Sequence, residues 1–210
     1  MEANTLKGTT TIGLKCSDGI VLIADKRASM GSFIASKRAQ KTYNINNTVG
    51  ATIAGGVGDA EALMRLVQAE AALYEMNNKN KMSANSVAAL MSNVLQNNKY
   101  YPYYVQLIIA GYNGKDTAVY TLDAVGGLSE ETMASTGSGS PVAYGLLEHL
   151  YVENKSVEDN LPIAVKALNS AMQRDCATGD GISLVTITKD GFREYSQDDV
   201  LKIAEKLKKK

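Results

Sequence analysis

Three consecutive threonines, Thr9, Thr10 and Thr11, follow Gly8 close to the start of the chain. A threonine hydroxyl attacks a carbonyl poorly unless a nearby base accepts its proton. The chain has a single histidine, His149, so the base would have to be that residue or a group of another kind. The triplet is equally typical of an ordinary strand, because threonine is favoured there, and by itself it predicts no activity.

Other candidate groups are weak when they are taken one at a time. Residues 55–59 and 137–141 are glycine-rich and precede expected helices, where an anion could bind. Neither segment has the GxGxxG or Lys-Ser/Thr signature of a nucleotide site, and the second lacks the GxSxG spacing of a nucleophile elbow. We interpret His149 as a structural residue, on or near the apolar face of its helix.

The composition excludes several classes of protein. Two cysteines, Cys16 and Cys176, without a CxxC motif cannot build a disulfide scaffold, and one histidine cannot build a multi-histidine metal site. Lys plus Arg and Asp plus Glu both number 22, so a neutral chain gives no electrostatic reason to expect nucleic acid or a membrane. The polar N-terminus is not a signal peptide, and no apolar run approaches roughly 18 residues. We expect a cytoplasmic protein.

Hydrophobic patterns predict the strands that would position these groups. Residues 9–16 alternate between apolar and polar side chains, which is typical of a half-buried strand. Residues 20–24 are apolar throughout, which indicates a strand buried on both faces, and Asp18-Gly19 between the two is a hairpin turn signal. Further strands are expected at residues 48–54, 103–112, 116–123, 182–188 and 192–195. Residues 34–43 have no clear pattern.

Helices are expected between these strands, and mostly in pairs. They begin at Asp59, after Ser83, at Pro141 with Ser140 as N-cap, at Ser156 and at Asp198. Ser83 is a plausible N-cap, and Ser156 opens a variant of the capping box. Sheets interrupted by helix pairs indicate one layered α+β domain, in which helices cover the outer faces of antiparallel sheet.

Taken together, segments spread along the chain resemble the proteasome β-subunit family, and most closely its archaeal catalytic type. They are residues 9–13, 19–28, 41, 54–60, 137–140, 174–175 and 179–181. These segments occur in the family's order and spacing, from Thr9 to about Tyr195. The resemblance implies the N-terminal nucleophile hydrolase fold, a four-layer αββα sandwich of two antiparallel sheets flanked by helix pairs.

The resemblance also implies that the chain removes its own leader, residues 1–8, at the Gly8–Thr9 bond, leaving residues 9–210 as a threonine-type endopeptidase domain. Cleavage would free an α-amino group on Thr9. An amine with a pKa of about 8 is partly neutral near pH 7, so it can serve as the base for the hydroxyl on the same residue. Gly8 would permit the bent backbone that attack on its own carbonyl requires.

Further residues match catalytic positions of the family. Lys41 matches the lysine whose ammonium lowers the pKa of the nucleophile's amine and hydroxyl, and Asp25 matches the carboxylate that orients this lysine. Ser138 and Asp175 match the polar residues that hold the amine and a bridging water. Thr178 stands where many members carry serine, and we expect its hydroxyl to keep that role.

The resemblance places the substrate site beside the nucleophile. The Gly55 backbone N–H matches the donor to the oxyanion, and an extended substrate is expected to pair with backbone near Ser29 and Gly55. The expected pocket lining is Ala28, Tyr43, Ile53 and Val57, with Glu61 deeper. Because this lining is mostly apolar, we expect cleavage after large apolar residues.

The family's partners are α-subunits and other β-subunits in stacked heptameric rings, ATP-dependent unfoldase caps, and unfolded polypeptides as substrates. The resemblance implies no cofactor, no metal, no nucleic acid and no membrane. Two alternatives remain: a ring-forming subunit that no longer cuts, and a small-molecule or nucleotide-binding domain. The first usually lacks the glycine, threonine or lysine that Gly8, Thr9 and Lys41 supply, and the second predicts phosphate-binding motifs that are missing.

Overall fold

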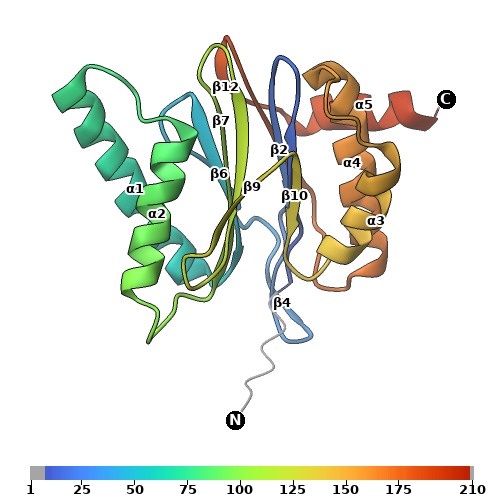
Figure 1. Ribbon diagram of the computed structural model, residues 1–210. Helices are drawn as coiled ribbons and strands as arrows, with labels where there is room; N and C mark the ends of the chain where they lie inside the picture. The colour runs from blue at the N-terminus through green and yellow to red at the C-terminus, as the bar shows by residue number, and fades with distance from the viewer. Residues whose placement is uncertain (1–7, 209–210) are drawn as a thin grey trace.

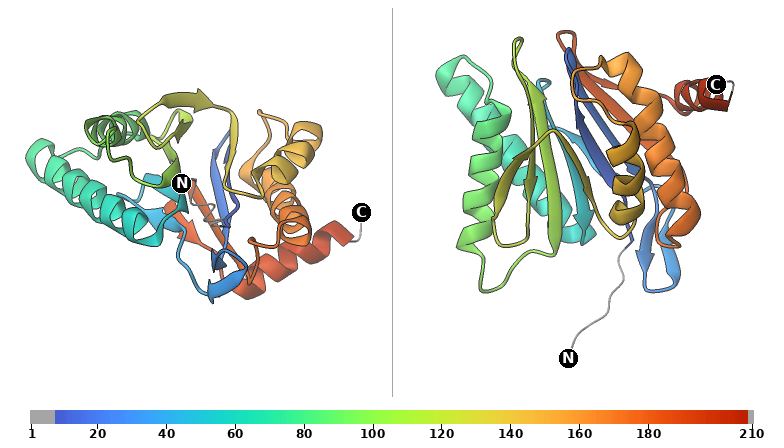
Figure 2. Two further views of the ribbon diagram at one scale, coloured as in Figure 1. Left: turned by 90° about the horizontal axis from the view of Figure 1, so that it is seen from below. Right: turned by 45° about the vertical axis from the view of Figure 1, so that its right-hand side comes forward.

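The computed structural model describes residues 8–208 and has four layers, with helices outside and two β-sheets inside (Figure 1). One outer layer consists of α1 (Val57–Asn78) and α2 (Ala84–Asn97). The other consists of α3 (Ser140–Leu150), α4 (Val157–Arg174) and α5 (Gln197–Lys208). Figure 2 shows the same layers from below and obliquely, so the predicted α+β sandwich is confirmed.

Both sheets are antiparallel and five-stranded. The strands of the first are, in order, β10 (Met133–Thr136), β1 (Thr11–Lys15), β2 (Gly19–Asp25), β11 (Ile182–Thr188) and β12 (Gly191–Glu194). Those of the second are β5 (Thr42–Asn44), β6 (Val49–Gly55), β7 (Val105–Tyr112), β8 (Thr117–Leu122) and β9 (Leu128–Glu131). A separate hairpin of β3 (Ala28–Met30) and β4 (Phe33–Ser36) extends at the bottom of Figure 1.

Two sequence-based expectations about α3 are wrong. Gly139 is its N-cap, while Ser140 already lies in the first turn together with Pro141. Proline is tolerated there because the first N–H groups of a helix have no intrahelical partner. His149 is exposed, because it follows the buried Leu147 by two positions, and residues at that spacing do not share a helix face.

The caps expected at Ser83 and Ser156 are confirmed by their side-chain bonds to backbone N–H groups.

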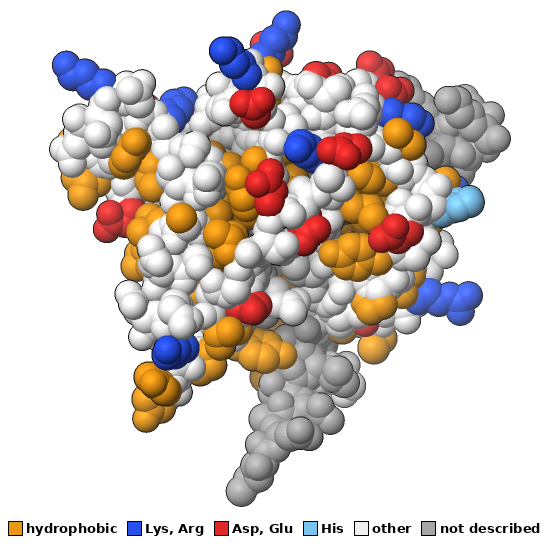
Figure 3. All heavy atoms as spheres, viewed as in Figure 1, with side chains coloured by type: hydrophobic (Ala, Val, Ile, Leu, Met, Phe, Trp, Pro, Cys, Tyr) orange, Lys and Arg blue, Asp and Glu red, His pale blue; other side chains and the backbone are white. Residues whose placement is uncertain are grey.

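The surface carries charges of both signs without a large patch of either on the face that Figure 3 shows. Hydrophobic atoms project at the lower left of that view, beneath α2. The loop that follows α2 includes Tyr100 and Tyr101, which are 83% and 91% exposed. Its tyrosine-rich sequence continues to Tyr104, whose backbone contacts the functional site described below.

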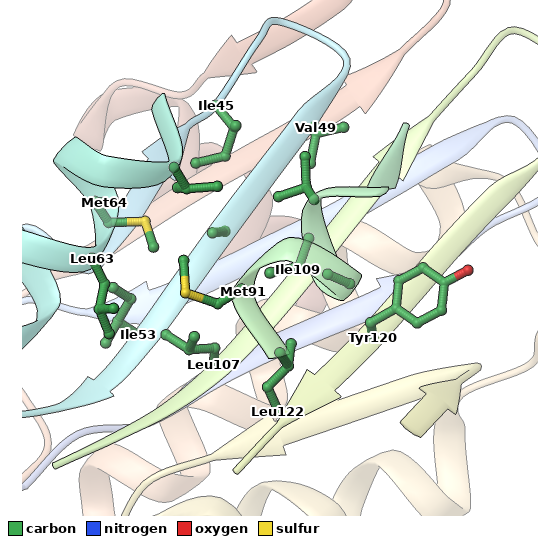
Figure 4. Close-up of a cluster of buried hydrophobic side chains, with 14 of the residues drawn as sticks. Ile45, Val49, Ile53, Leu63, Met64, Met91, Leu107, Ile109, Tyr120 and Leu122 are labelled. Atoms are coloured by element: carbon green, nitrogen blue, oxygen red, sulfur yellow. The ribbon is translucent and has the colours of Figure 1, made fainter. Parts of the chain in front are cut away.

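Three buried clusters separate the four layers. One lies between α1, α2 and the second sheet and includes Leu63, Met91 and Leu107 (Figure 4). A second lies between the first sheet and helices α3, α4 and α5. The third fills the space between the two sheets. Residues of β2 serve both the second and the third cluster, as expected for a strand that is buried on both faces.

The space between the sheets changes character from one end to the other. One end, here called the apolar end, is filled by the apolar side chains of Ile20, Leu22, Val119, Val185 and Ile187. The other end, here called the hydroxyl end, contains the buried hydroxyl groups of Thr11, Thr42, Thr52, Thr136 and Ser183. Thr11 Oγ1 lies 2.6 Å from Thr136 Oγ1 and accepts a 3.0 Å bond from Thr52 Oγ1, so hydrogen bonds link the two sheets there.

Candidate active site

The candidate site lies at the hydroxyl end, where β1 begins and β2 and β6 end. Thr9 precedes β1 and is only 3% exposed. Its hydroxyl donates a 2.6 Å hydrogen bond to the carbonyl oxygen of Gly8. Its backbone N–H donates to Ser138 Oγ at 3.3 Å. The hydroxyl of Thr9 is therefore beside the peptide bond that joins it to Gly8.

A buried ion pair lies next to Thr9. Lys41 Nζ donates a 2.7 Å bond to Asp25 Oδ1, and the Asp25 carboxylate is fully buried. The backbone N–H groups of Thr10, Arg27 and Gly179 donate to the same carboxylate at 2.9, 3.1 and 2.9 Å. A buried carboxylate is tolerated only when it is paired and hydrogen-bonded, and these donors satisfy Asp25 and fix the position of the Lys41 ammonium.

Burial lowers the pKa of Lys41 from its usual value of 10.5. The charge and hydrogen bond of Asp25 act in the opposite direction, and the charge of Asp175 adds to them. The lysine is 7% exposed at its side chain, so removal from water is the larger effect. A charged lysine in this position favours the deprotonated forms of neighbouring groups.

On the other side of Thr9, Asp175 gathers two hydroxyls. Ser138 Oγ and Thr178 Oγ1 both donate 2.5 Å bonds to Asp175 Oδ2. Thr178 Oγ1 also lies 2.8 Å from the hydroxyl of Thr10. The threonine at position 178 thus presents its hydroxyl to Asp175, and a chain of hydrogen bonds runs from the backbone nitrogen of Thr9 to a carboxylate.

The last residue of β6 is held in an unusual backbone conformation. Gly55 has φ of +134°, and a Cβ added there would overlap the backbone carbonyl of Tyr104, so only glycine fits. Gly56 N–H donates to that carbonyl at 2.7 Å, and Tyr104 N–H donates to Asp59 Oδ2 at 2.8 Å. Asp59, in the first turn of α1, therefore fixes the segment that carries the Gly55 N–H.

A pocket of about 230 Å³ opens between Thr9 and Gly55. All but one of the pocket residues that the sequence predicts are present in its lining: Ala28, Ser29, Tyr43, Ile53, Gly55 and Val57. Glu61 is not part of it. The lining also contains residues that were not predicted: Met30, Ala35, Ala39, Gln40 and Ala60. Most of these come from the segment without a clear pattern, and small alanines carry no chemical signal that would have identified them.

Gly8 is enclosed on two sides. Its N–H donates a 2.9 Å bond to Ser29 Oγ. On the other side, the position that a Cβ of residue 8 would occupy is already filled by Ala177, including its backbone. The residue before Thr9 is therefore held in a slot that accepts only glycine.

An ion pair that sequence reasoning missed fixes the segment carrying Asp175 and Thr178. Arg27 Nε donates to Asp180 Oδ2 at 2.6 Å, and Arg27 Nη1 donates to the carbonyl of Cys176 at 2.6 Å. The hydrogen bond from Arg27 holds the pKa of Asp180 below its usual value. The two segments lie 153 residues apart in the chain, so no local pattern indicates this contact.

Within residues 8–208, no group of three or more His, Cys, Asp and Glu side chains is arranged to hold a metal ion. None of the helices in this part of the chain combines the length and apolar character that crossing a membrane requires.

The geometry joins a buried hydroxyl, a buried lysine–carboxylate pair, a glycine turn and an apolar pocket. Such a site can carry out nucleophilic attack on a carbonyl, with the pocket holding the side chain that precedes the bond. The sequence-predicted residues Thr9, Asp25, Lys41, Ser138, Asp175 and Thr178 all meet within it.

Comparison with known proteins points to the same class. A family model described as proteasome subunit matches residues 5–187. Proteins named proteasome subunit beta are similar over nearly the whole chain. That of Archaeoglobus profundus is 48% identical over 210 residues, 100% of this chain and 98% of its own. That of Methanococcus maripaludis is 50% identical over 207 residues, 98% and 94% of the two chains.

A third relative, from Methanosarcina thermophila, is 50% identical over 196 residues, which cover 93% of both chains. The match of the family model and these identities confirm the resemblance expected from the sequence. Membership implies assembly with other proteasome subunits. This chain therefore belongs to the proteasome subunit family.

Proposed function

We propose that this chain is a catalytic β-subunit of a 20S proteasome core particle, a threonine-type endopeptidase that first removes its own leader, residues 1–8. One observation carries the proposal: the Thr9 hydroxyl is hydrogen-bonded to the carbonyl of Gly8 at 2.6 Å, between a buried lysine and a pocket. The similarity to proteasome β-subunits supports it.

Self-cleavage proceeds in two steps. Thr9 Oγ1 attacks the carbonyl carbon of Gly8, the C–N bond of the Gly8–Thr9 peptide breaks, and the hydroxyl proton passes to the Thr9 nitrogen. The product is an ester between Gly8 and the Thr9 side chain. Water then hydrolyses this ester, which releases the leader with a terminal carboxyl group and leaves Thr9 with a free amine and a free hydroxyl.

Peptide hydrolysis repeats this chemistry on a second molecule. The positive charge of Lys41 favours the neutral form of the new α-amine of Thr9, which then accepts the hydroxyl proton; the same charge stabilises the alkoxide that forms. Ser138, which already accepts a bond from the Thr9 nitrogen, holds the amine, and Asp175 holds Ser138. The Gly55 N–H donates to the oxyanion, a role whose loss typically costs about 10²–10³ in rate.

The pocket sets the preference for the residue before the cleaved bond. Its lining combines Tyr43, Ile53 and Val57 with several alanines, and Lys41 at its edge is paired with Asp25. Large apolar side chains gain most from entering such a space. Peptides that differ only in Leu, Arg or Glu at this position test the preference, and faster cleavage after Glu would contradict it.

The same proposal includes the wider assembly. The chain forms heptameric rings with other β-subunits, stacks against rings of α-subunits, and receives unfolded polypeptides from ATP-dependent unfoldases in the cytoplasm. These partners follow from the resemblance to the family rather than from a surface of this chain.

Thr9→Ala tests the catalytic role. The full chain and the variant are produced with the same partner subunits, and their intact masses are compared. We expect the parent to lose residues 1–8 and to hydrolyse an apolar peptide, while Thr9→Ala retains its leader and is inactive. Thr9→Ser, which keeps a hydroxyl, should still be processed. Loss of the leader from Thr9→Ala would show that another protease makes the cut.

A further inference from the structure

Ser29 makes a contact that the proposed mechanism does not use. It lies in β3, in the hairpin beside the pocket, and its Oγ accepts a 2.9 Å hydrogen bond from the N–H of Gly8. The family resemblance predicts that the backbone near Ser29 pairs with substrate, whereas this contact is made by the side chain of Ser29. The bond exists only while Gly8 is attached, because the released leader carries that N–H away.

Gly8 has to be held for self-cleavage to occur. Glycine is the most flexible residue, so the carbonyl before Thr9 would sample many orientations if nothing restrained it. The structure restrains it on three sides: Ser29 Oγ binds its N–H, Ala177 closes the space beside its Cα, and the Thr9 hydroxyl contacts its carbonyl oxygen. Restricting the two reacting groups to one geometry accelerates an intramolecular reaction.

We propose that the hydroxyl of Ser29 positions Gly8 for removal of the leader. It holds the N–H of the residue before the cleaved bond while Thr9 Oγ1 attacks the carbonyl carbon on the other side of that residue. Ser29 exchanges no proton and forms no covalent bond, so it is a positioning residue. The inference rests on the proposed function, because it concerns the same self-cleavage.

The test compares Ser29→Thr with Ser29→Val. Threonine and valine have nearly the same shape, but only threonine has a hydroxyl. Ser29→Ala accompanies them, and Ser36→Ala, which removes an exposed hydroxyl from the neighbouring β4, is the control. Each full chain is synthesised with the same partner subunits, and loss of residues 1–8 is followed by intact mass over time.

We expect Ser29→Val and Ser29→Ala to slow leader removal by about 3- to 10-fold, as the loss of one neutral hydrogen bond predicts. Ser29→Thr and Ser36→Ala should be processed at the parent rate. A merely structural role for residue 29 would not distinguish threonine from valine. Equal rates for these two variants, or parent-like processing of Ser29→Ala, would overturn the inference.

Thr9→Ala in the same series separates this inference from the proposed function. If Thr9→Ala keeps its leader and Ser29→Ala is processed at the parent rate, only the role of Ser29 is wrong. If Thr9→Ala loses its leader, self-cleavage itself is wrong, and the role of Ser29 falls with it.

Discussion

The two ends of the space between the sheets are built from different side chains. The apolar end packs isoleucine, leucine and valine, whereas the hydroxyl end links threonines and a serine through hydrogen bonds of 2.6 to 3.0 Å. Hydrophobic packing is strong but has no preferred direction, while a hydrogen bond fixes distance and angle. Hydrogen bonds therefore fix the positions of atoms at the end that carries the candidate active site, and hydrophobic packing stabilises the fold at the opposite end.

The largest effect is expected from Lys41→Met, at the hydroxyl end. Losing a charge that stabilises the reacting groups should lower peptide hydrolysis by about 10²–10³-fold. Lys37→Met is the control, because Lys37 belongs to the same segment but its side chain is 70% exposed. Initial rates of hydrolysis of one apolar peptide are measured for both variants. An equal loss of rate in the two would contradict a special role for the buried lysine.

Leu22→Ala, at the apolar end, should have a large effect of a different kind. Leu22 is fully buried between the sheets, and truncation of such a leucine costs about 2–5 kcal/mol of the free energy of unfolding. The rate per folded molecule should change little, since the buried cluster around Leu22 includes none of the candidate site residues. Urea unfolding and peptide hydrolysis measured on the same samples check this, and a loss of rate without a loss of stability would contradict it.

Thr52→Val probes the hydroxyl end without touching the catalytic groups. The change keeps the shape of the side chain but removes the 3.0 Å bond to Thr11 Oγ1, so stability should fall by about 0.5–1.5 kcal/mol. Because Thr11 stands two residues after Thr9, the rate should fall as well. Thr52→Ser, which keeps the hydroxyl, should preserve the rate better than Thr52→Val does.

The smallest effect concerns pH. The pKa of Lys41 is lowered from 10.5 by burial, so between its folded and unfolded pKa values the unfolded chain holds a proton that the folded chain has lost. The free energy of unfolding contributed by this group therefore rises with pH up to about 10.5, and the cost of burying the charge is fully present below the folded pKa. Urea unfolding of the parent and of Lys41→Met across this range should give a steeper rise for the parent; parallel curves would argue against a lowered pKa.

The long elements could be predicted from the sequence because each buries a regular pattern of side chains. Strands β3, β4 and β9 could not, since none of their residues is buried and no alternation of buried apolar and exposed polar side chains results. Strand β10 was not predicted either. These short strands are specified by their pairing partners, which the local sequence does not contain.

The candidate site likewise contains residues that could be identified from the sequence and contacts that could not. Thr9, Lys41 and Asp25 were identified through the family resemblance rather than through spacing. They lie before β1, before β5 and at the end of β2, and these segments meet only after folding. The bond from Gly8 to Ser29 and the pair of Arg27 with Asp180 were not predicted at all. Each depends on the distance between two atoms, and residue types alone do not determine that distance.

The slot that Ala177 forms beside Gly8 also determines the effect of missense mutations at position 8. Every codon change that replaces Gly8 introduces an amino acid with a Cβ, and Ala177 already occupies that place. Under the proposed self-cleavage, a missense mutation there would leave the buried layers of the fold intact and prevent removal of residues 1–8. Position 8 is thus a point at which a single nucleotide could silence the enzyme without reducing the amount of folded protein.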